Sequence, residues 1–244
     1  MDKSSFIAAY SAIMEKNRLT DFAGEALAER FFALTERMLE VNAHMNLTAI
    51  TDMEGIILKH YADSLTIAPY IPDNASVIDV GCGAGFPSLP LAIARPDLRI
   101  TAFDSTTKRI HYISETAEML GIRNITAITA RAEELALDPE YRERFDISCA
   151  RAVARLNVLS ELCIPFVKPG GAFIAMKANA AEELTEAENA LRKLGGKLRC
   201  ADCFSLISDS ASDENPRCMV VIEKISPTPK NYPRNYSQIK KKPL

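Results

Sequence analysis

The sequence predicts an α/β protein: a seven-stranded, mostly parallel sheet with helices on both faces, preceded by an N-terminal helical extension. The first observation behind this prediction is the alternation of strand and helix patterns after residue 75, because such alternation produces parallel strands joined by helices. The second is a glycine-rich bend, Gly81-Cys82-Gly83-Ala84-Gly85, directly after the first strand. Sheets of this kind bind their ligands at such bends.

Residues 1–72 show helical patterns. In the second predicted helix, apolar side chains recur at alternating steps of four and three residues and make one stripe: Leu27, Phe31, Leu34, Met38, Val41 and Met45. A shorter helix is predicted from Asp52 to about Leu65, and Pro69 and Pro72 end the region. We interpret residues 1–72 as a helical cover for the sheet.

Residues 73–226 are predicted to form the core. Five strands are expected, at 76–80, 99–104, 124–130, 145–150 and 168–178. Helices are expected at 86–94, 107–121, 156–167 and 181–194. Two final β runs, 197–207 and 217–225, are joined by the polar loop 208–216. We therefore expect a closing hairpin that adds an antiparallel strand at or near one sheet edge.

The charge is unevenly distributed along the chain. The net charge of −3 alone does not suggest a nucleic-acid-binding protein. From Lys224 onward, however, there are six basic residues and no acidic one, so residues 1–223 carry a net charge of −9. This split indicates a polyanionic partner, and we interpret residues 227–244 as a basic tail.

Composition and cysteine spacing exclude several other classes. No run approaches the roughly 20 apolar residues of a membrane span, and the N-terminus lacks the layout of a signal peptide. We therefore expect a cytoplasmic protein without membrane contact. We also expect a monomer, although nothing in the sequence fixes the oligomeric state. Cys200-x-x-Cys203 is not followed by further ligands at zinc-site spacing. We expect no metal, and we expect all six cysteines to be buried and reduced.

The glycine bend does not have the spacing of a dinucleotide-binding turn. Its third glycine comes one residue early, Phe86 stands where that turn needs a small residue, and Pro87 removes an N–H that could bind phosphate. The bend therefore suits a ligand that approaches the backbone closely but brings no pyrophosphate. Glycines that serve only tight packing are the alternative.

Two acids flank the bend and point to a ligand class. Asp79 precedes it, and Asp104, followed by Ser105, ends the second strand. Asp104 can accept two hydrogen bonds from a ribose diol, and two carboxylates together attract a cation. S-adenosylmethionine carries both a ribose diol and a sulfonium. In addition, the loop after the third strand is expected to lie beside the adenine, where Ala132 and Glu133 offer a backbone N–H and a side-chain acceptor.

The end of the fourth strand limits the class of methyl acceptor. Methylases of exocyclic base amines carry Asn or Asp, Pro-Pro and an aromatic residue there, whereas this chain has Cys149-Ala150-Arg151-Ala152. Cytosine C5 methylation needs a cysteine nucleophile. Cys149 is suitably placed for that role, but the flanking prolines typical of that class are missing, which counts against this alternative.

Eight stretches resemble one known family. They are NLTAI (46–50), KHYADSL (59–65), DVGCGAGFPSLPLAI (79–93), FDSTTKRIHYI (103–113), RAEEL (131–135), ARAVARL (150–156), AMK (175–177) and the terminal NYPR…KKPL. They resemble the bacterial 16S rRNA guanine-N7 methyltransferases, also called glucose-inhibited division protein B. These are class I enzymes with a Rossmann-like fold. Two stretches depart from the family: Cys149 replaces a common serine, and NYSQI replaces a more basic, glycine-containing segment.

The resemblance implies that the chain methylates a guanine in the decoding-region loop of 16S rRNA, either as RNA or within the small ribosomal subunit. S-adenosylmethionine would be the donor and S-adenosylhomocysteine the product. The predicted cofactor-binding residues are Asp79, Gly81, Gly83, Gly85, Phe86, Asp104, Ser105, Ala132, Glu133 and Arg151.

The chemistry of guanine N7 requires little of the protein. This nitrogen has an in-plane lone pair and no proton at neutral pH, so it accepts a methyl group without a general base. The enzyme must align the reactants and exclude water. We therefore predict no obligatory catalytic residue and name Arg151 and His60 as positioning candidates. An arginine that bound both O6 and N7 would block the reaction, so we expect Arg151 to bind O6, a phosphate or a carboxylate.

Basic residues near the active edge of the sheet and in the tail are the candidate RNA contacts. They are Lys108, Arg109, Arg155, Lys177, Arg234 and Lys240. The tail mixes cations with tyrosines that can stack on bases, and a disordered end is its alternative. Two other functions stay open: a small-molecule methyltransferase of the same fold, and a nucleotide-binding regulatory protein without catalysis.

Overall fold

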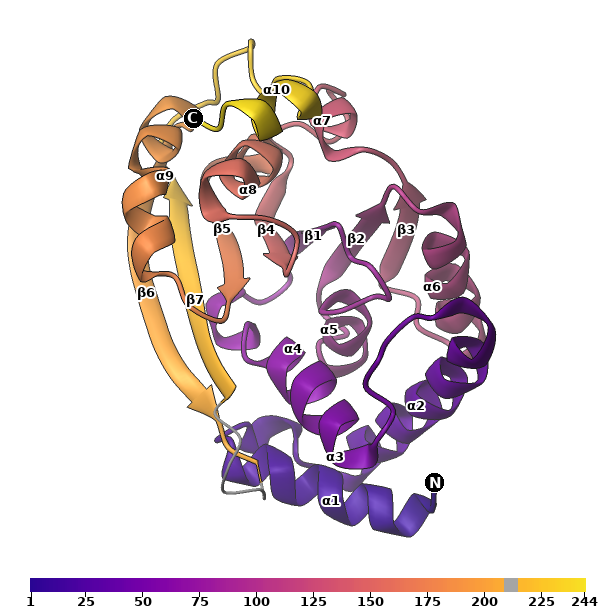
Figure 1. Ribbon diagram of the computed structural model, residues 1–244. Helices are drawn as coiled ribbons and strands as arrows, with labels where there is room; N and C mark the ends of the chain where they lie inside the picture. The colour runs from indigo at the N-terminus through magenta and orange to yellow at the C-terminus, as the bar shows by residue number, and fades with distance from the viewer. Residues whose placement is uncertain (209–214) are drawn as a thin grey trace.

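The computed structural model of the protein describes residues 1–208 and 215–244. Its centre is a seven-stranded sheet in the order β3-β2-β1-β4-β5-β7-β6 (Figure 1). The strands are β1 (Ser76–Val80), β2 (Arg99–Asp104), β3 (Ile125–Thr129), β4 (Phe145–Arg151), β5 (Val167–Lys177), β6 (Gly196–Leu206) and β7 (Asn215–Lys224). The first five pair in parallel. The predicted mostly parallel sheet is therefore confirmed.

The predicted closing hairpin is also confirmed. Strand β7 pairs antiparallel with both β5 and β6, so β7 lies inside the sheet and β6 forms its edge. Most of the predicted connecting loop, 208–216, lies outside the described residues.

Helices cover both faces of the sheet, as predicted. They are α1 (Lys3–Lys16), α2 (Glu25–Met45), α3 (Met53–Gly55), α4 (Asp63–Leu65), α5 (Ser88–Ala94), α6 (Thr107–Met119), α7 (Ala132–Leu135), α8 (Leu156–Cys163), α9 (Ala181–Leu194) and α10 (Tyr236–Lys241). Helices α1 to α6 contribute to one apolar cluster and α7 to α10 to the other. Successive strand residues point to opposite faces: in β1, Val77 packs in the first cluster and Ile78 in the second.

The N-terminal helices complete one of these two cores. Phe6 and Phe31 are fully buried in the same cluster as Val77 and Ile100 of the sheet, and α1 lies beside α2 (Figure 1). A π-helical stretch, Ile56–Ala62, joins α3 to α4 and makes the region 53–65 continuously helical, close to the prediction for 52–65. The helices of residues 1–72 therefore share one apolar core with the sheet.

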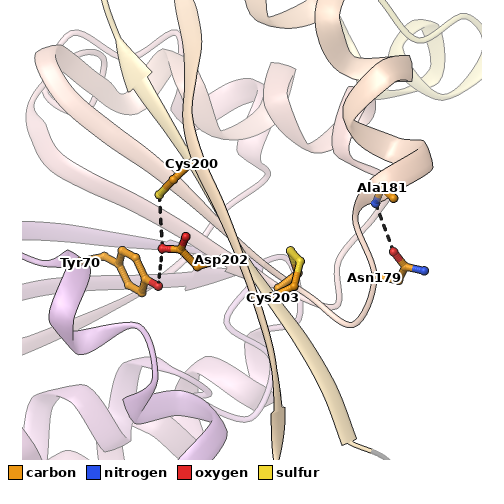
Figure 2. The surroundings of a disulfide bond; sticks show 7 residues. Tyr70, Asn179, Ala181, Cys200, Asp202 and Cys203 are labelled. Carbon is orange, nitrogen blue, oxygen red and sulfur yellow. Dashed lines mark hydrogen bonds between the residues drawn. A yellow bond between two sulfur atoms is a disulfide. The ribbon is translucent and has the colours of Figure 1, made fainter.

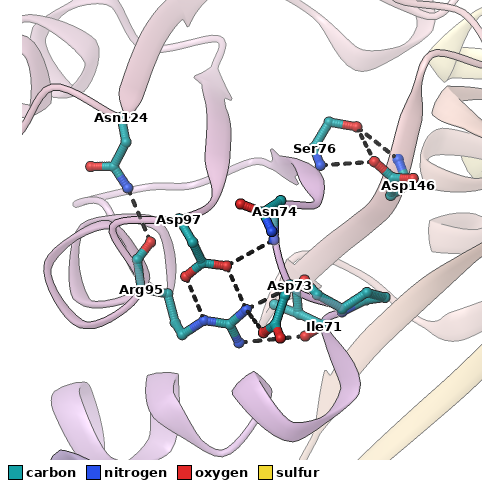
Figure 3. A network of polar contacts seen from close by, with 9 residues as sticks. Ile71, Asp73, Asn74, Ser76, Arg95, Asp97, Asn124 and Asp146 are labelled. Atoms are coloured by element: carbon teal, nitrogen blue, oxygen red, sulfur yellow. Dashed lines mark hydrogen bonds and ion pairs between the residues drawn. The ribbon is translucent and has the colours of Figure 1, made fainter.

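A polar network holds together the amino ends of the strands, on the side away from the glycine bend (Figure 3). The Arg95 guanidinium donates to both carboxylate oxygens of Asp97 at 2.8 Å and to Asp73 at 3.0 Å. Ser76 donates from its backbone N and its hydroxyl to Asp146 of β4, at 2.8 and 2.6 Å. These contacts fix β1, β2 and β4 relative to one another at that end.

The cysteine prediction is wrong for the pair Cys203 and Cys218, and Cys200 is only partly buried. Cys203 of β6 and Cys218 of β7 form a disulfide (Figure 2). They are direct partners in the antiparallel register, with Cα atoms 4.0 Å apart, and sequence spacing does not reveal that register. Cys203 is also exposed. Cys200 instead donates weakly to the Asp202 carboxylate, and Cys82, Cys149 and Cys163 are free and buried, as expected.

None of the helices in residues 1–208 and 215–244 combines the length and the apolar character needed to cross a bilayer.

Candidate active site

A cavity of about 510 Å³ opens at the carboxyl ends of the parallel strands. The loops after β1, β2, β3 and β4 line it. Because β2 and β3 lie on one side of β1 and β4 on the other, the cavity sits where the strand order reverses. Sheets of this class bind ligands at that point.

The glycine bend forms the floor of this cavity. Gly81 and Gly83 line it, both with φ in the left-handed region, at 72° and 57°. A Cβ on Gly83 would meet no atom within 4 Å and would project into open space, whereas a Cβ on Gly85 would lie 2.6 Å from Leu89. Gly83 therefore leaves room for a ligand, and Gly85 allows close packing of α5 beneath the bend.

Asp104 is held at the cavity wall by backbone donors. Gly83 N donates to its Oδ2 at 3.1 Å, and Thr106 N donates to its Oδ1 at 2.8 Å. Arg109 Nη1 lies 3.7 Å from Oδ2, and the neighbouring Ser105 also lines the cavity. Each carboxylate oxygen retains a further lone pair, so the orientation of Asp104 fits the acceptor of a diol.

Asp79 lies beneath the bend and does not line the cavity. Its Oδ2 accepts from the Ser88 hydroxyl at 2.6 Å, and its Oδ1 has no hydrogen-bond partner among the described residues. Burial raises the pKa of Asp79 to about 6, although the hydrogen bonds from Ser88 and the charge of Arg151 oppose this change. Asp79 can thus act on a bound cation through its charge, without direct contact.

The loop after β3 supplies one end of the cavity. Ala132 and Glu133 line it, as do the apolar side chains of Phe103 and Leu162. Tyr236, from the C-terminal helix α10, lies in the same wall. In the sequence, Tyr236 belongs to the predicted basic tail, and no pattern there indicates that the tail folds back to this loop.

The opposite end of the cavity contains a stack of flat side chains. The His60 imidazole lies parallel to the Phe86 ring, with centroids 4.4 Å apart and planes 8° apart. The Arg151 guanidinium carbon lies 5.4 Å from the same Phe86 centroid. His60 Nε2 bonds the Thr48 hydroxyl at 2.8 Å. Burial, followed by the charge of Arg151, lowers the pKa of His60 to about 4, so this imidazole is neutral at physiological pH.

Asp63 holds Arg151 in this position. Arg151 Nη1 donates to Asp63 Oδ2 at 2.8 Å and to the Lys59 carbonyl at 3.1 Å. Arg217 Nε from β7 donates to the other oxygen, Oδ1, at 2.6 Å. One carboxylate, only 6% exposed, is therefore bonded by two arginines. The sequence placed Asp63 one turn after His60 but gave no indication of Arg217, because 154 residues separate the pair.

The structure places the six candidate RNA-contact residues in different settings. Arg109 lines the cavity and is 43% exposed, and Lys108 and Lys240 are exposed. Arg109 also lies 3.7 Å from the Asp104 carboxylate, and the other three have closer carboxylate partners. Arg155 pairs with Glu186 at 2.7 Å, Lys177 with Glu183 at 2.8 Å, and Arg234 with Glu161 at 2.6 Å.

The thiol of Cys149 does not face this site. Cys149 is completely buried, does not line the cavity, and burial raises its pKa well above that of a free thiol. A protonated thiol without access to the cavity cannot attack a cytosine ring. Within the described residues there is also no group of three or more His, Cys, Asp or Glu side chains that could hold a metal ion.

Comparison with known proteins agrees with this geometry. Residues 27–206 match a family model described as GidB, rRNA small subunit methyltransferase G. A protein named ribosomal RNA small subunit methyltransferase G from Acetivibrio thermocellus is 48% identical over 217 residues, which are 88% of each chain. Its namesake from Halalkalibacterium halodurans is 46% identical over 240 residues, covering 93% of this chain and 99% of the other.

Solved structures show the same fold at low identity. M. jannaschii TYW2, determined in complex with AdoMet, has a TM-score of 0.54 at 18% identity and covers 67% of this chain and 75% of its own. An O-methyltransferase from Thermotoga maritima that depends on SAM has a TM-score of 0.53 at 15% identity, covering 79% and 72%.

Proposed function

The chain belongs to the rRNA small subunit methyltransferase G family, and on this premise we propose that it transfers a methyl group from S-adenosylmethionine to N7 of a guanine in 16S rRNA. The observation that carries the proposal is the cavity at the strand-order reversal. There, Gly83 leaves open space for a ligand, and its backbone N–H donates to the Asp104 carboxylate and so orients it toward the cavity.

The residues of the cavity fit this cofactor. We propose that Asp104 binds the ribose hydroxyls and that Gly81 and Gly83 allow the backbone to approach. Ala132 and Glu133 would bind the adenine, while Asp79 favours the sulfonium electrostatically from below the bend. When bound, S-adenosylmethionine supplies a methyl group that guanine N7 accepts through its own lone pair.

The side chains at the other end of the cavity position the base. His60 has a pKa of about 4 and is a weak base, which suits an acceptor that has no proton to lose. Arg151 uses one terminal nitrogen for Asp63 and Lys59, and its Nε and Nη2 have no such bond within the described residues. We propose that these groups bind guanine O6 or a phosphate and that the Phe86–His60 stack excludes water.

Basic side chains near the cavity and in the tail are the proposed RNA contacts. We propose Lys108, Arg109 and Lys240 as phosphate contacts, because Lys108 and Lys240 are exposed and Arg109 lines the cavity with a side chain that is 43% exposed. Arg155, Lys177 and Arg234 would first have to leave their carboxylate partners. We further propose that the protein acts in the cytoplasm as a monomer, with residues 1–72 as cover, 73–226 as catalytic core and 227–244 as tail.

Methyl mapping tests the proposal directly. Purified protein is incubated with methyl-labelled S-adenosylmethionine and either naked 16S rRNA or small ribosomal subunits, and digested RNA is analysed by mass spectrometry. One 7-methylguanosine in the decoding-region loop is expected, and it should be missing from cells that lack the gene. Methylation of another base atom would overturn the assignment to N7. Labelling of a metabolite panel but not of RNA would favour a small-molecule methyltransferase, and cofactor binding without transfer would favour a regulatory role.

A further inference from the structure

The C-terminal tail is fixed to the core by a buried ion pair. Glu161 of α8 is fully buried, and Arg234 bonds it three times: from its backbone N at 2.8 Å, from Nε at 2.9 Å and from Nη2 at 2.6 Å. A buried carboxylate without a cation is strongly destabilising. The core therefore needs the tail in place to neutralise Glu161.

Further contacts fix the path of the tail before and after Arg234. Arg142 donates to the backbone carbonyls of Thr228, Pro229 and Tyr232 at 2.9 to 3.2 Å. Asn235 caps α10 by accepting from Gln238 N. Ile239 of α10 is completely buried in the apolar cluster of α8. Helix α10 accordingly lies against α8 and close to α7 (Figure 1).

This path brings Tyr236 into the wall of the cavity. The residue directly follows the cap Asn235, is 39% exposed, and lines the cavity with Leu162, Ala132 and Glu133. A half-exposed aromatic ring beside apolar Leu162 and a carboxylate suits a flat ligand with a polar edge, such as a purine.

We propose that Tyr236 packs against the adenine of the bound cofactor, so that the start of helix α10 is part of the cofactor site. This inference rests on the proposed function. If Asp104 holds the ribose at the end of β2 and the methyl group lies toward Arg151 at the end of β4, the base extends in the other direction, toward β3 and α7. Tyr236 is in that direction, because it lines the cavity from α10, which lies against α8 and close to α7 (Figure 1).

Binding of S-adenosylhomocysteine, measured by calorimetry, tests the inference. Tyr236→Ala should weaken binding about tenfold through loss of ring contact. Tyr236→Phe, which keeps the ring, should bind within about twofold of the parent protein. Gln238→Ala is the matched control, because Gln238 is exposed on the same helix and does not line the cavity. Affinity for purified 16S rRNA, measured in parallel, should be the same for Tyr236→Ala as for the parent.

A double-mutant cycle distinguishes the contact of the Tyr236 ring with the cofactor from the anchoring of the tail by Arg234. Arg234→Ala should also weaken S-adenosylhomocysteine binding, because it releases the tail, and adding Tyr236→Ala to it should cause little further loss. Unchanged S-adenosylhomocysteine affinity in Tyr236→Ala overturns the inference, and so does a loss of rRNA affinity alone, which would make Tyr236 an RNA contact. If the parent protein itself does not bind S-adenosylhomocysteine, the proposed function fails instead.

Discussion

Arg151 donates from Nη1 to Oδ2 of Asp63 at 2.8 Å, and this bond links the cavity to the helical cover. Asp63 is itself bonded to Arg217 of β7. The orientation of the guanidinium beside Phe86 therefore depends on a helix from residues 1–72 and on a strand near the end of the sheet.

Asp63→Asn should separate turnover from cofactor binding. The variant leaves two arginines with one neutral partner, so the free energy of unfolding should fall by about 3 kcal/mol. Methyl transfer to rRNA should slow by at least about tenfold because Arg151 loses its fixed orientation. Since Asp63 does not line the cavity, the dissociation constant for S-adenosylhomocysteine should change little. Asp21→Asn, on an exposed residue, is the control, and equal turnover in the two variants would contradict this role.

Asp104→Ala should weaken cofactor binding by about 1–3 kcal/mol, because the ribose hydroxyls lose their acceptor. The bonds from Gly83 N and Thr106 N are lost as well, so Asp104→Asn, which retains an acceptor oxygen, should show a smaller effect. Calorimetry with S-adenosylhomocysteine measures both. An affinity equal to that of the parent protein would remove Asp104 from the site.

Asp79 should make stability depend on pH in a defined window. Its pKa is raised from 3.8 to about 6. Between these values the folded protein keeps a proton that the unfolded chain releases, so the free energy of unfolding decreases as pH rises. The stabilisation from this retained proton is fully present below pH 4. Above pH 6 it is lost, and the free energy of unfolding is then lower by roughly 3 kcal/mol.

Asp79→Asn removes this titration, so urea unfolding of variant and parent at pH 4 and pH 7 measures it. The stability of the variant relative to the parent should increase from pH 4 to pH 7. A difference that stays constant across this range would show that Asp79 titrates at its ordinary value. Asp21→Asn serves again as the exposed control.

Reduction should destabilise the β6–β7 hairpin. The Cys203–Cys218 bond spans a sequence separation of 15, and removing a cross-link of that span costs about 3 kcal/mol in the chain-entropy account. Dithiothreitol should therefore lower the urea midpoint of the parent protein. It should leave the Cys203→Ser/Cys218→Ser double variant unchanged. Identical midpoints for the parent with and without reductant would contradict the prediction.

Sequence patterns within short segments predicted the strands, the helices and the glycine bend. The alternation of strand and helix gave the sheet, and the stripe from Leu27 to Met45 gave α2. The bend at Gly81–Gly85 and the acid at Asp104 were enough to locate the cavity. In each case neighbouring residues set the backbone conformation. The location of the cavity at the carboxyl ends of the strands then follows from the parallel sheet.

Most of the parts that were missed depend on contacts between residues far apart in the sequence. Cys203 meets Cys218 only through the pairing of β6 with β7, and Arg217 meets Asp63 only because β7 inserts beside β5. Asp79 was expected in the cavity, but its side chain points beneath the bend toward Ser88. Tyr236 reaches the cavity because a buried carboxylate on α8 binds the tail, and no periodic pattern encodes such a contact.

The walls of the cavity come from segments far apart in the chain, with Leu47 directly after α2 and Tyr236 at the start of α10. A ribosome releases these segments in order, so the wall at Tyr236 becomes available only after every element from α1 to β7 has been synthesised. A ligand stabilises only the state that binds it. If Tyr236 contacts the cofactor as proposed, that contact can therefore stabilise the protein only after α10 has been synthesised.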